Sequence, residues 1–168
     1  MGSFRVMNRA DTRQIALATP TGFLAFGFGS GLAPVAPGTA GTIASLPFAA
    51  LIVQLPFSVA LAVVIAGFLI GVPLCGIIGK KLGVHDHGGI VWDEFVGMWL
   101  VLLFVPFHWG WWLAAFVLFR IFDAAKPWPI RWFDRRVHGG FGVMLDDALA
   151  AGFTLLVLVP AMYWLSAG

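Results

Sequence analysis

The chain has 168 residues, of which 60% are hydrophobic and 11% are charged, and it contains eight tryptophans and sixteen phenylalanines. This composition predicts an integral membrane protein. The formal net charge of +2 is small and no dense basic stretch is present, which argues against nucleic acid as a partner.

Residues 1–18 form a basic and polar N-terminal segment. The segment lacks the basic, then apolar, then small-residue order of a cleaved secretory signal, so we expect it to remain on the protein in the cytosol. Segment 19–41 is apolar but crowded with glycine and proline. Such a composition disfavours a regular helix and predicts an irregular or re-entrant backbone that is shielded by protein.

Five apolar runs follow, at about 42–54, 59–79, 95–106, 111–122 and 148–165. They predict an all-α integral membrane protein, a bundle of about five short transmembrane helices within one membrane-embedded domain at 19–168. Several runs are shorter than the roughly 20 residues of a full span, so their polar ends must belong to the helices, or the helices lie partly in the interface.

Formal charges occur only in the N-terminal segment, in the connection 80–94 and in the region 120–147. With five spans, these regions lie on the same side of the membrane. The positive-inside rule places that side in the cytosol. We therefore expect a polar cap on the cytosolic face of the bundle.

Five carboxylates stand at the ends of apolar runs, namely Asp93, Glu94, Asp123, Asp146 and Asp147. An ionised carboxylate near hydrocarbon is costly unless a cation, a basic side chain or a metal compensates it. Chemistry on a charged ligand at a membrane surface would explain their convergence.

The stretch GVHDHGGIVWDEFVG, residues 83–97, places Asp86, Asp93 and Glu94 in a short loop and a helix start. Hard oxygen ligands suit Mg²⁺, so these three acids are candidate metal ligands. The alternative is N-capping, because acids in a first helical turn oppose the helix macrodipole. Gly97 follows Asp93 by four residues, where a small side chain allows another helix to come close to the acids.

In FRIFDAAKPWPIRWFD, residues 119–134, a cation, an anion and a cation recur every third residue as Arg120, Asp123 and Lys126. The spacing predicts one helical face on which the two basic groups grip phosphate oxygens and Asp123 binds metal. The alternative is an ion pair satisfied within the helix, with Lys126 reaching toward the interface.

Two further stretches are candidate ligand sites. In HGGFGVMLDDALAAG, residues 138–152, a glycine-rich turn is expected to lead into a helix whose first turn holds Asp146 and Asp147, as metal ligands or as capping residues. In LAPVAPGTAGTIASLP, residues 32–47, a helix start after a proline brings Gly38, Thr39 and Thr42 together. Free N–H groups at such a start bind phosphate, whereas small-residue packing is the alternative.

Taken together, the motifs GFGSGLAPVAPGTAGTIASLP, HDHGGIVWDEFVGMW and FRIFDAAKPWPIRWFDRRVHGGFGVMLDDALAAG closely resemble the phosphatidylglycerophosphatase A family of Gram-negative bacteria. The resemblance runs from about Gly27 to Gly152. It implies a multi-pass lipid phosphatase of the bacterial inner membrane that uses Mg²⁺ to hydrolyse phosphatidylglycerophosphate to phosphatidylglycerol and inorganic phosphate. The family's acidic motifs fall on Asp93, Glu94, Asp123, Asp146 and Asp147, its basic positions on Arg120 and Lys126, and its PGT motif on Pro37, Gly38 and Thr39.

Two mechanisms are compatible with these residues. In the first, a Mg²⁺-bound water deprotonated by one of the acids attacks phosphorus in line. In the second, Asp123 or Asp93 is a covalent nucleophile. The alternative outside enzymology is a small cation or proton transport protein with acidic residues at one membrane face.

Overall fold

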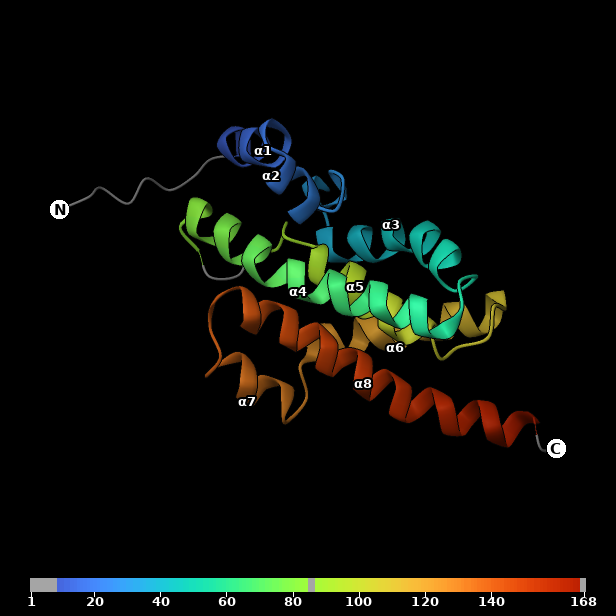
Figure 1. The fold of residues 1–168 in the computed structure, drawn as a ribbon. Coiled ribbons are helices and arrows are strands. Elements are labelled where there is room, and N and C mark those ends of the chain that lie inside the picture. The colour runs from blue at the N-terminus through green and yellow to red at the C-terminus, as the bar shows by residue number, and fades with distance from the viewer. Residues whose placement is uncertain (1–8, 85–86, 167–168) are drawn as a thin grey trace.

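The computed structural model describes residues 9–84 and 87–166, except the side chain of Ser166. Within these ranges the secondary structure consists of eight α-helices and one short 3₁₀-helix, with no strand, which confirms the predicted all-α class. The helices, shown in Figure 1, are α1 (Arg9–Ala18), α2 (Pro20–Ala25), η1 (Ser30–Leu32), α3 (Pro37–Ile52), α4 (Phe57–Leu82), α5 (Trp92–Leu102), α6 (Trp109–Ala125), α7 (Ile130–Asp134) and α8 (Gly139–Ser166).

Helices α3, α4, α5, α6 and α8 each overlap one of the five predicted apolar runs, and α8 begins well before its run. Two of them are long and apolar enough to cross a bilayer, α4 over its whole length and α8 from Gly139 to Leu165. The others have 16 residues in α3, 11 in α5 and 17 in α6, fewer than the roughly 20 of a full span. The described residues thus contain two candidate membrane spans. The predicted number of about five transmembrane helices is not confirmed by the structure.

The prediction of an irregular segment 19–41 is wrong at its two ends, because Pro20–Ala25 is helical and residues 37–41 belong to α3. Proline at a first helical position needs no N–H partner, and the Thr19 hydroxyl caps the helix by accepting the N–H of Gly22 at 3.0 Å. The prediction fits the connection that follows. There the backbone turns through positive φ angles at Gly27 and Gly29 before α3 begins at Pro37.

Helix α5 is the core of the bundle. It packs against α3, α4, α6 and α8, and most of its side chains are buried. Two indole N–H groups anchor it to backbone carbonyls of its neighbours. Trp92 Nε1 donates to Gly67 O of α4 at 3.0 Å, and Trp99 Nε1 donates to Ser45 O of α3 at 3.2 Å. This anchoring fixes the position of the acids at the start of α5.

Glycines allow the long helices to approach closely. A Cβ atom on Gly140 of α8 would overlap the carbonyl oxygen of Val72 and lie 2.6 Å from the N atom of Gly76, both in α4. A Cβ atom on Gly97 of α5 would lie 2.7 Å from Phe119 of α6 and 3.3 Å from Asp147 of α8. Gly97 therefore permits the close approach to the acids that its spacing predicted.

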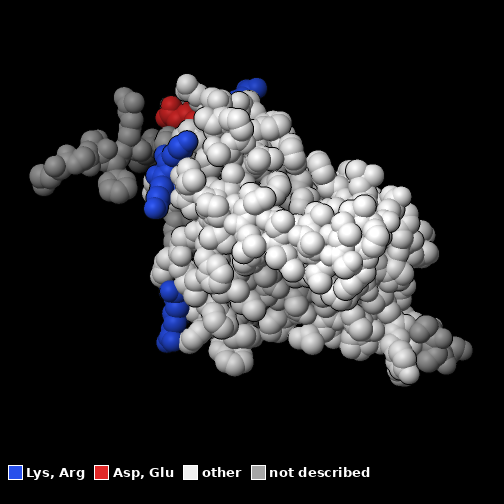
Figure 2. Space-filling model, in the orientation of Figure 1, with Lys and Arg blue, Asp and Glu red and all other residues white. Residues whose placement is uncertain are grey.

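The outer surface of the bundle is strongly apolar. Large exposed apolar side chains on the two long helices include Ile65, Leu69, Ile70 and Ile77 of α4 and Leu156, Val157 and Val159 of α8. On the face that Figure 2 shows, charged side chains gather along one end and the remainder is uncharged. An apolar belt with charges at one end is typical of a protein embedded in a bilayer.

Candidate functional site

Asp93 and Glu94 lie in the first turn of α5 and are buried, with exposed fractions of 7% and 8%. The N-cap residue Val91 has no polar side chain, and its N–H donates to Ala25 O at 2.9 Å, which fixes the start of the helix. The position of the two acids also suits the helix macrodipole, so the capping interpretation stays open for them.

Asp146 and Asp147 do not lie in a first helical turn, contrary to the prediction. Helix α8 begins at Gly139 and has no acidic residue in its first turn. Both carboxylates are buried in the body of the helix, where they cannot cap its N-terminus. Helix capping is thereby removed as their explanation.

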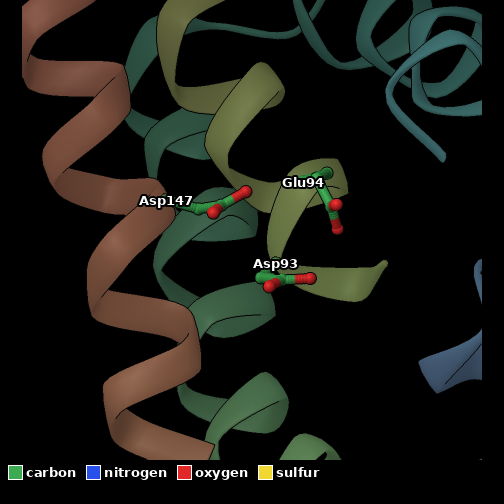
Figure 3. A group of neighbouring side chains, drawn as sticks. All are labelled: Asp93, Glu94 and Asp147. Carbon is green, nitrogen blue, oxygen red and sulfur yellow. The ribbon is translucent and has the colours of Figure 1, made fainter. Parts of the chain in front are cut away.

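The structure brings all five predicted carboxylates to one small cavity of about 140 Å³. The cavity is lined by Gly88, Ile90, Asp93, Glu94, Asp123, Lys126, Val143, Asp146 and Asp147. In Figure 3, Asp147 extends from α8 toward the first turn of α5, which carries Asp93 and Glu94. One carboxylate oxygen from each of these three residues lies within 4.8 Å of the others.

This arrangement fits a hard divalent cation. Ligand oxygens of an octahedral Mg²⁺ are about 2.9 Å apart when adjacent and about 4.1 Å apart when opposite, so three oxygens within 4.8 Å of one another would move closer together on binding one ion. Among the described residues, no donor reaches the buried oxygens Glu94 Oε2, Asp146 Oδ1 or Asp147 Oδ2. A buried oxygen without a hydrogen-bond donor lowers the stability of the fold, and a bound cation would compensate it.

Arg120 links α6 to the acidic cluster. Its Nη1 atom lies 2.6 Å from Asp123 Oδ2 in the same helix and 3.6 Å from Glu94 Oε1 of α5. The intrahelical ion pair that the sequence allowed is therefore present, but the guanidinium also interacts across to the neighbouring helix. Planar guanidinium groups suit this bridging role because they present several donors in fixed directions.

Lys126 joins the cluster from the end of α6. Its backbone adopts a left-handed conformation, with φ of 42°, which ends the helix. Its ammonium donates hydrogen bonds of 2.9 Å both to Asp146 Oδ2 and to Asp134 Oδ1, so it points into the protein. Burial alone would lower the pKa of Lys126, but the hydrogen bonds to Asp134 and Asp146 outweigh it and raise the pKa above its usual value.

Asp134, at the end of α7, was not predicted as a site residue. It is the last residue of the stretch 119–134, but nothing in the spacing indicates a partner eight residues earlier. The turn through Pro127 and Pro129 brings it back to Lys126. Asp86, a predicted metal ligand, lies outside the described residues.

The N-terminus of α3 lies against the cluster. A Cβ atom on Gly38 would overlap Glu94 Oε1 and lie 2.8 Å from Arg120 Nη2. Thr39 is the next residue of this first turn, whereas Thr42 is buried and donates its hydroxyl proton to Gly38 O at 2.8 Å. The structure thus brings Gly38 to the acids and engages the Thr42 hydroxyl within the helix.

Residues 23–162 match the family model described as Phosphatidylglycerophosphatase A. The chain belongs to the phosphatidylglycerophosphatase A family. This family membership makes it an enzyme of the phosphatase type.

Members of the phosphatidylglycerophosphatase A family are also its curated relatives. The chain is 54% identical to the phosphatidylglycerophosphatase A of Escherichia coli over 138 residues, covering 82% of this chain and 80% of the relative. It is 46% identical to the Haemophilus influenzae protein of the same name over 155 residues, covering 91% and 95%. A Bacteroides thetaiotaomicron protein, described provisionally as a phosphatidylinositol-3-phosphatase, is 41% identical over 145 residues, covering 82% and 90%. No solved structure matches the chain.

The segment matched by the phosphatidylglycerophosphatase A model contains every described member of the cluster and excludes α1.

Proposed function

We propose that this chain hydrolyses phosphatidylglycerophosphate to phosphatidylglycerol and inorganic phosphate, and that the reaction depends on Mg²⁺. The observation that carries the proposal is the cavity of about 140 Å³ in which carboxylates from three helices meet a lysine. A terminal phosphomonoester carries almost two negative charges, so a site for it requires cations that neutralise its oxygens.

We assign the metal to Asp93, Glu94 and Asp147, whose oxygens are already close together. The other two acids have a different role. Asp123 pairs with Arg120 and Asp146 pairs with Lys126, so both acids hold a cation in position beside the metal ligands. Bound Mg²⁺ would supply a Lewis acid that polarises the phosphoryl group and favours attack by water.

The phosphate is proposed to lie at the N-terminus of α3. Its N-cap residue Ala36 has no polar side chain, so the first N–H groups of the helix are left for a ligand or for water. Gly38 places this turn directly beside Arg120, whose guanidinium would share the phosphate oxygens with those N–H groups. One carboxylate of the cluster would accept the proton of the attacking water and return it to the lipid glycerol oxygen, which leaves as its bond to phosphorus breaks.

We place the chain in the bacterial inner membrane as a multi-pass protein, and its apolar surface supports embedding in a bilayer. Beside α4 and α8, the shorter helices also expose large apolar side chains, among them Ile43 and Leu51 of α3 and Leu113, Val117 and Ile121 of α6. We propose that the helices containing the five apolar runs are embedded in the bilayer, with the charged end and the cavity facing the cytosol. The acyl chains of the substrate would then remain in the bilayer while its head group reaches the cavity.

The transport alternative is not favoured. The family to which the chain belongs is named for a phosphatase, and the cluster combines carboxylates with an arginine and a lysine, as a phosphate site requires.

The test uses the purified full chain with phosphatidylglycerophosphate in mixed micelles, following phosphate release. We expect release to stop in excess chelator and to return when Mg²⁺ is added back. The rate of phosphate release by Asp93→Asn and by Asp147→Asn should be at least about 100-fold below that of wild type, because each substitution removes a proposed metal ligand. Asp11→Asn, which changes an acid of α1 outside the cavity, serves as the matched control and should keep wild-type activity.

Phosphate release by wild type in chelator would overturn the metal dependence, and full activity in both asparagine variants of the cavity would overturn the site. A phosphatidylinositol 3-phosphate arm addresses the substrate, because one relative carries that activity in its name. A higher kcat/KM for that lipid would overturn the proposed substrate while keeping the site.

A further inference from the structure

The surface around α7 is a second charged feature, separate from the acidic cavity. A hollow of about 420 Å³ is lined by Pro127, Trp128, Arg131, Trp132, Arg135 and Arg136, which we call the α7 surface. Half of these residues are arginines and none is acidic. The acid of this helix, Asp134, accepts a hydrogen bond from Lys126 and so belongs to the cavity side. The α7 surface is thus a basic hollow.

The arginines of the α7 surface are partly held in place. Arg131 Nη2 donates to the carbonyl oxygen of Ala125 at 3.2 Å, and the guanidinium carbon of Arg136 lies 4.1 Å from the centre of the Trp132 ring. Stacking of a guanidinium on an indole restricts its motion and leaves its edge N–H groups available. Such a group matches the paired oxygens of a phosphate.

The two tryptophans indicate that such a phosphate would belong to a lipid head group. Trp128 is 80% exposed and Trp132 is 42% exposed, although both are among the largest apolar side chains. Exposed indoles beside arginines are typical of the membrane–water interface, where the ring lies at the level of the lipid head groups. Helix α7 packs against α8, one of the two candidate spans, so the hollow lies beside a helix that would cross the bilayer.

We propose that the α7 surface binds the phosphodiester head group of an anionic phospholipid in the surrounding bilayer. Trp128 lies among the head groups, and the arginines hold the phosphodiester. The site is distinct from the catalytic cavity, but the two share α7, because Asp134 at the end of this helix accepts from Lys126 of the cavity. The inference does not depend on which lipid the enzyme hydrolyses.

The test measures binding of phosphatidylserine, an anionic phospholipid that is neither the proposed substrate nor its product. The full chain in neutral detergent micelles is titrated with phosphatidylserine carrying brominated acyl chains, and the fluorescence of Trp128 is obtained as the difference between wild type and Trp128→Phe. Brominated phosphatidylcholine, which has no net charge, is the control lipid. We expect Trp128 to be quenched at lower concentrations of phosphatidylserine than of phosphatidylcholine.

A matched pair of variants then locates the site. Each basic side chain at an anionic lipid surface contributes a factor of about five in affinity, so Arg135→Gln with Arg136→Gln should raise the apparent Kd about 25-fold. Lys80→Gln with Lys81→Gln removes the same charge from the last turn of α4 and should change the Kd less than about twofold. Arg135→Gln alone, expected to give about a fivefold rise, tests the surface without disturbing the stacked arginine.

Equal quenching by the two lipids would overturn the proposal. So would equal losses in the arginine and lysine variants, since the effect would then follow net charge alone. Quenching that persists unchanged in Trp128→Phe would place the bound lipid elsewhere and overturn it as well. Circular dichroism of each variant verifies that the helices are intact.

Discussion

Gly38→Ala is the substitution that best separates activity from stability. Glycine at this position places the first turn of α3 against Glu94 and Arg120. An added Cβ atom would overlap Glu94 Oε1 and lie only 2.8 Å from Arg120 Nη2. Since non-bonded atoms settle at about 3.5 Å or more, the carboxylate has to move by roughly 1 Å and the guanidinium by somewhat less.

The displaced atoms are the ends of flexible side chains, so the bundle can accommodate them at small cost. Alanine is also favoured over glycine in a helix by about 1 kcal/mol, which offsets part of the strain. We therefore expect the free energy of unfolding to change by less than about 1 kcal/mol. A misplacement of about 1 Å in a site of this kind lowers kcat/KM about 100-fold, or about 2.7 kcal/mol of transition-state stabilisation.

The assay combines phosphate release from phosphatidylglycerophosphate micelles with thermal unfolding in the same detergent. Two glycines of α8 are controls. Gly152→Ala adds a Cβ atom that meets no described heavy atom within 4 Å, so activity should be unchanged and stability equal or higher. Gly140→Ala should lower stability by about 1–3 kcal/mol, because its Cβ meets the backbone of α4. Wild-type activity in folded Gly38→Ala would refute the placement of phosphate at α3.

Three further predictions follow from individual contacts. Asp147→Asn removes a buried carboxylate that lies among other acids, so the Tm of this variant in chelator should equal or exceed that of wild type. The rise in Tm on adding Mg²⁺ should be smaller than in wild type. An unchanged rise would contradict the assignment of Asp147 as a metal ligand. Lys126→Met should lower Tm by the same amount at every pH between about 8 and 9. The raised pKa of Lys126 keeps its stabilisation complete below the unfolded-state pKa, and the stabilisation is lost only as pH rises through the folded-state value. A loss in Tm that fades within this window would contradict the raised pKa. Trp99→Phe, which leaves Ser45 O without the indole donor at 3.2 Å, should lower stability by about 1–3 kcal/mol with little change in KM, and equal stability would show that the bond contributes nothing.

The positions of the helices along the chain were predictable because helix formation depends on local sequence. An apolar run must bury its backbone polar groups in helical hydrogen bonds when it meets lipid, so each run predicted a helix. The same rule made the glycine-rich segment look irregular, and it failed at Pro20–Ala25, where a threonine cap and a proline suit a short helix. The number of membrane spans was harder to predict, because it depends on which helices face lipid. Hydrophobicity gives the same signal for the buried helix α5 as for a helix that faces lipid.

The composition of the site was predictable only as a set of residue types. The sequence indicated carboxylates and cations at one end of the bundle, and it proposed helix capping as the alternative for Asp146 and Asp147. The structure removes that alternative, because α8 begins seven residues before Asp146. It also adds Asp134, whose contact with Lys126 depends on a turn through two prolines.

The sequence by itself determined that this chain is helical and rich in apolar side chains, because both properties follow from composition along short stretches of chain. Only the tertiary structure decided which charges meet. The cavity depends on glycines that let α3 and α8 approach α5, and on the burial of Asp93, Glu94 and Asp147 within 4.8 Å of one another. Distances between helices are set by the packing of residues far apart in the chain, which no local pattern records.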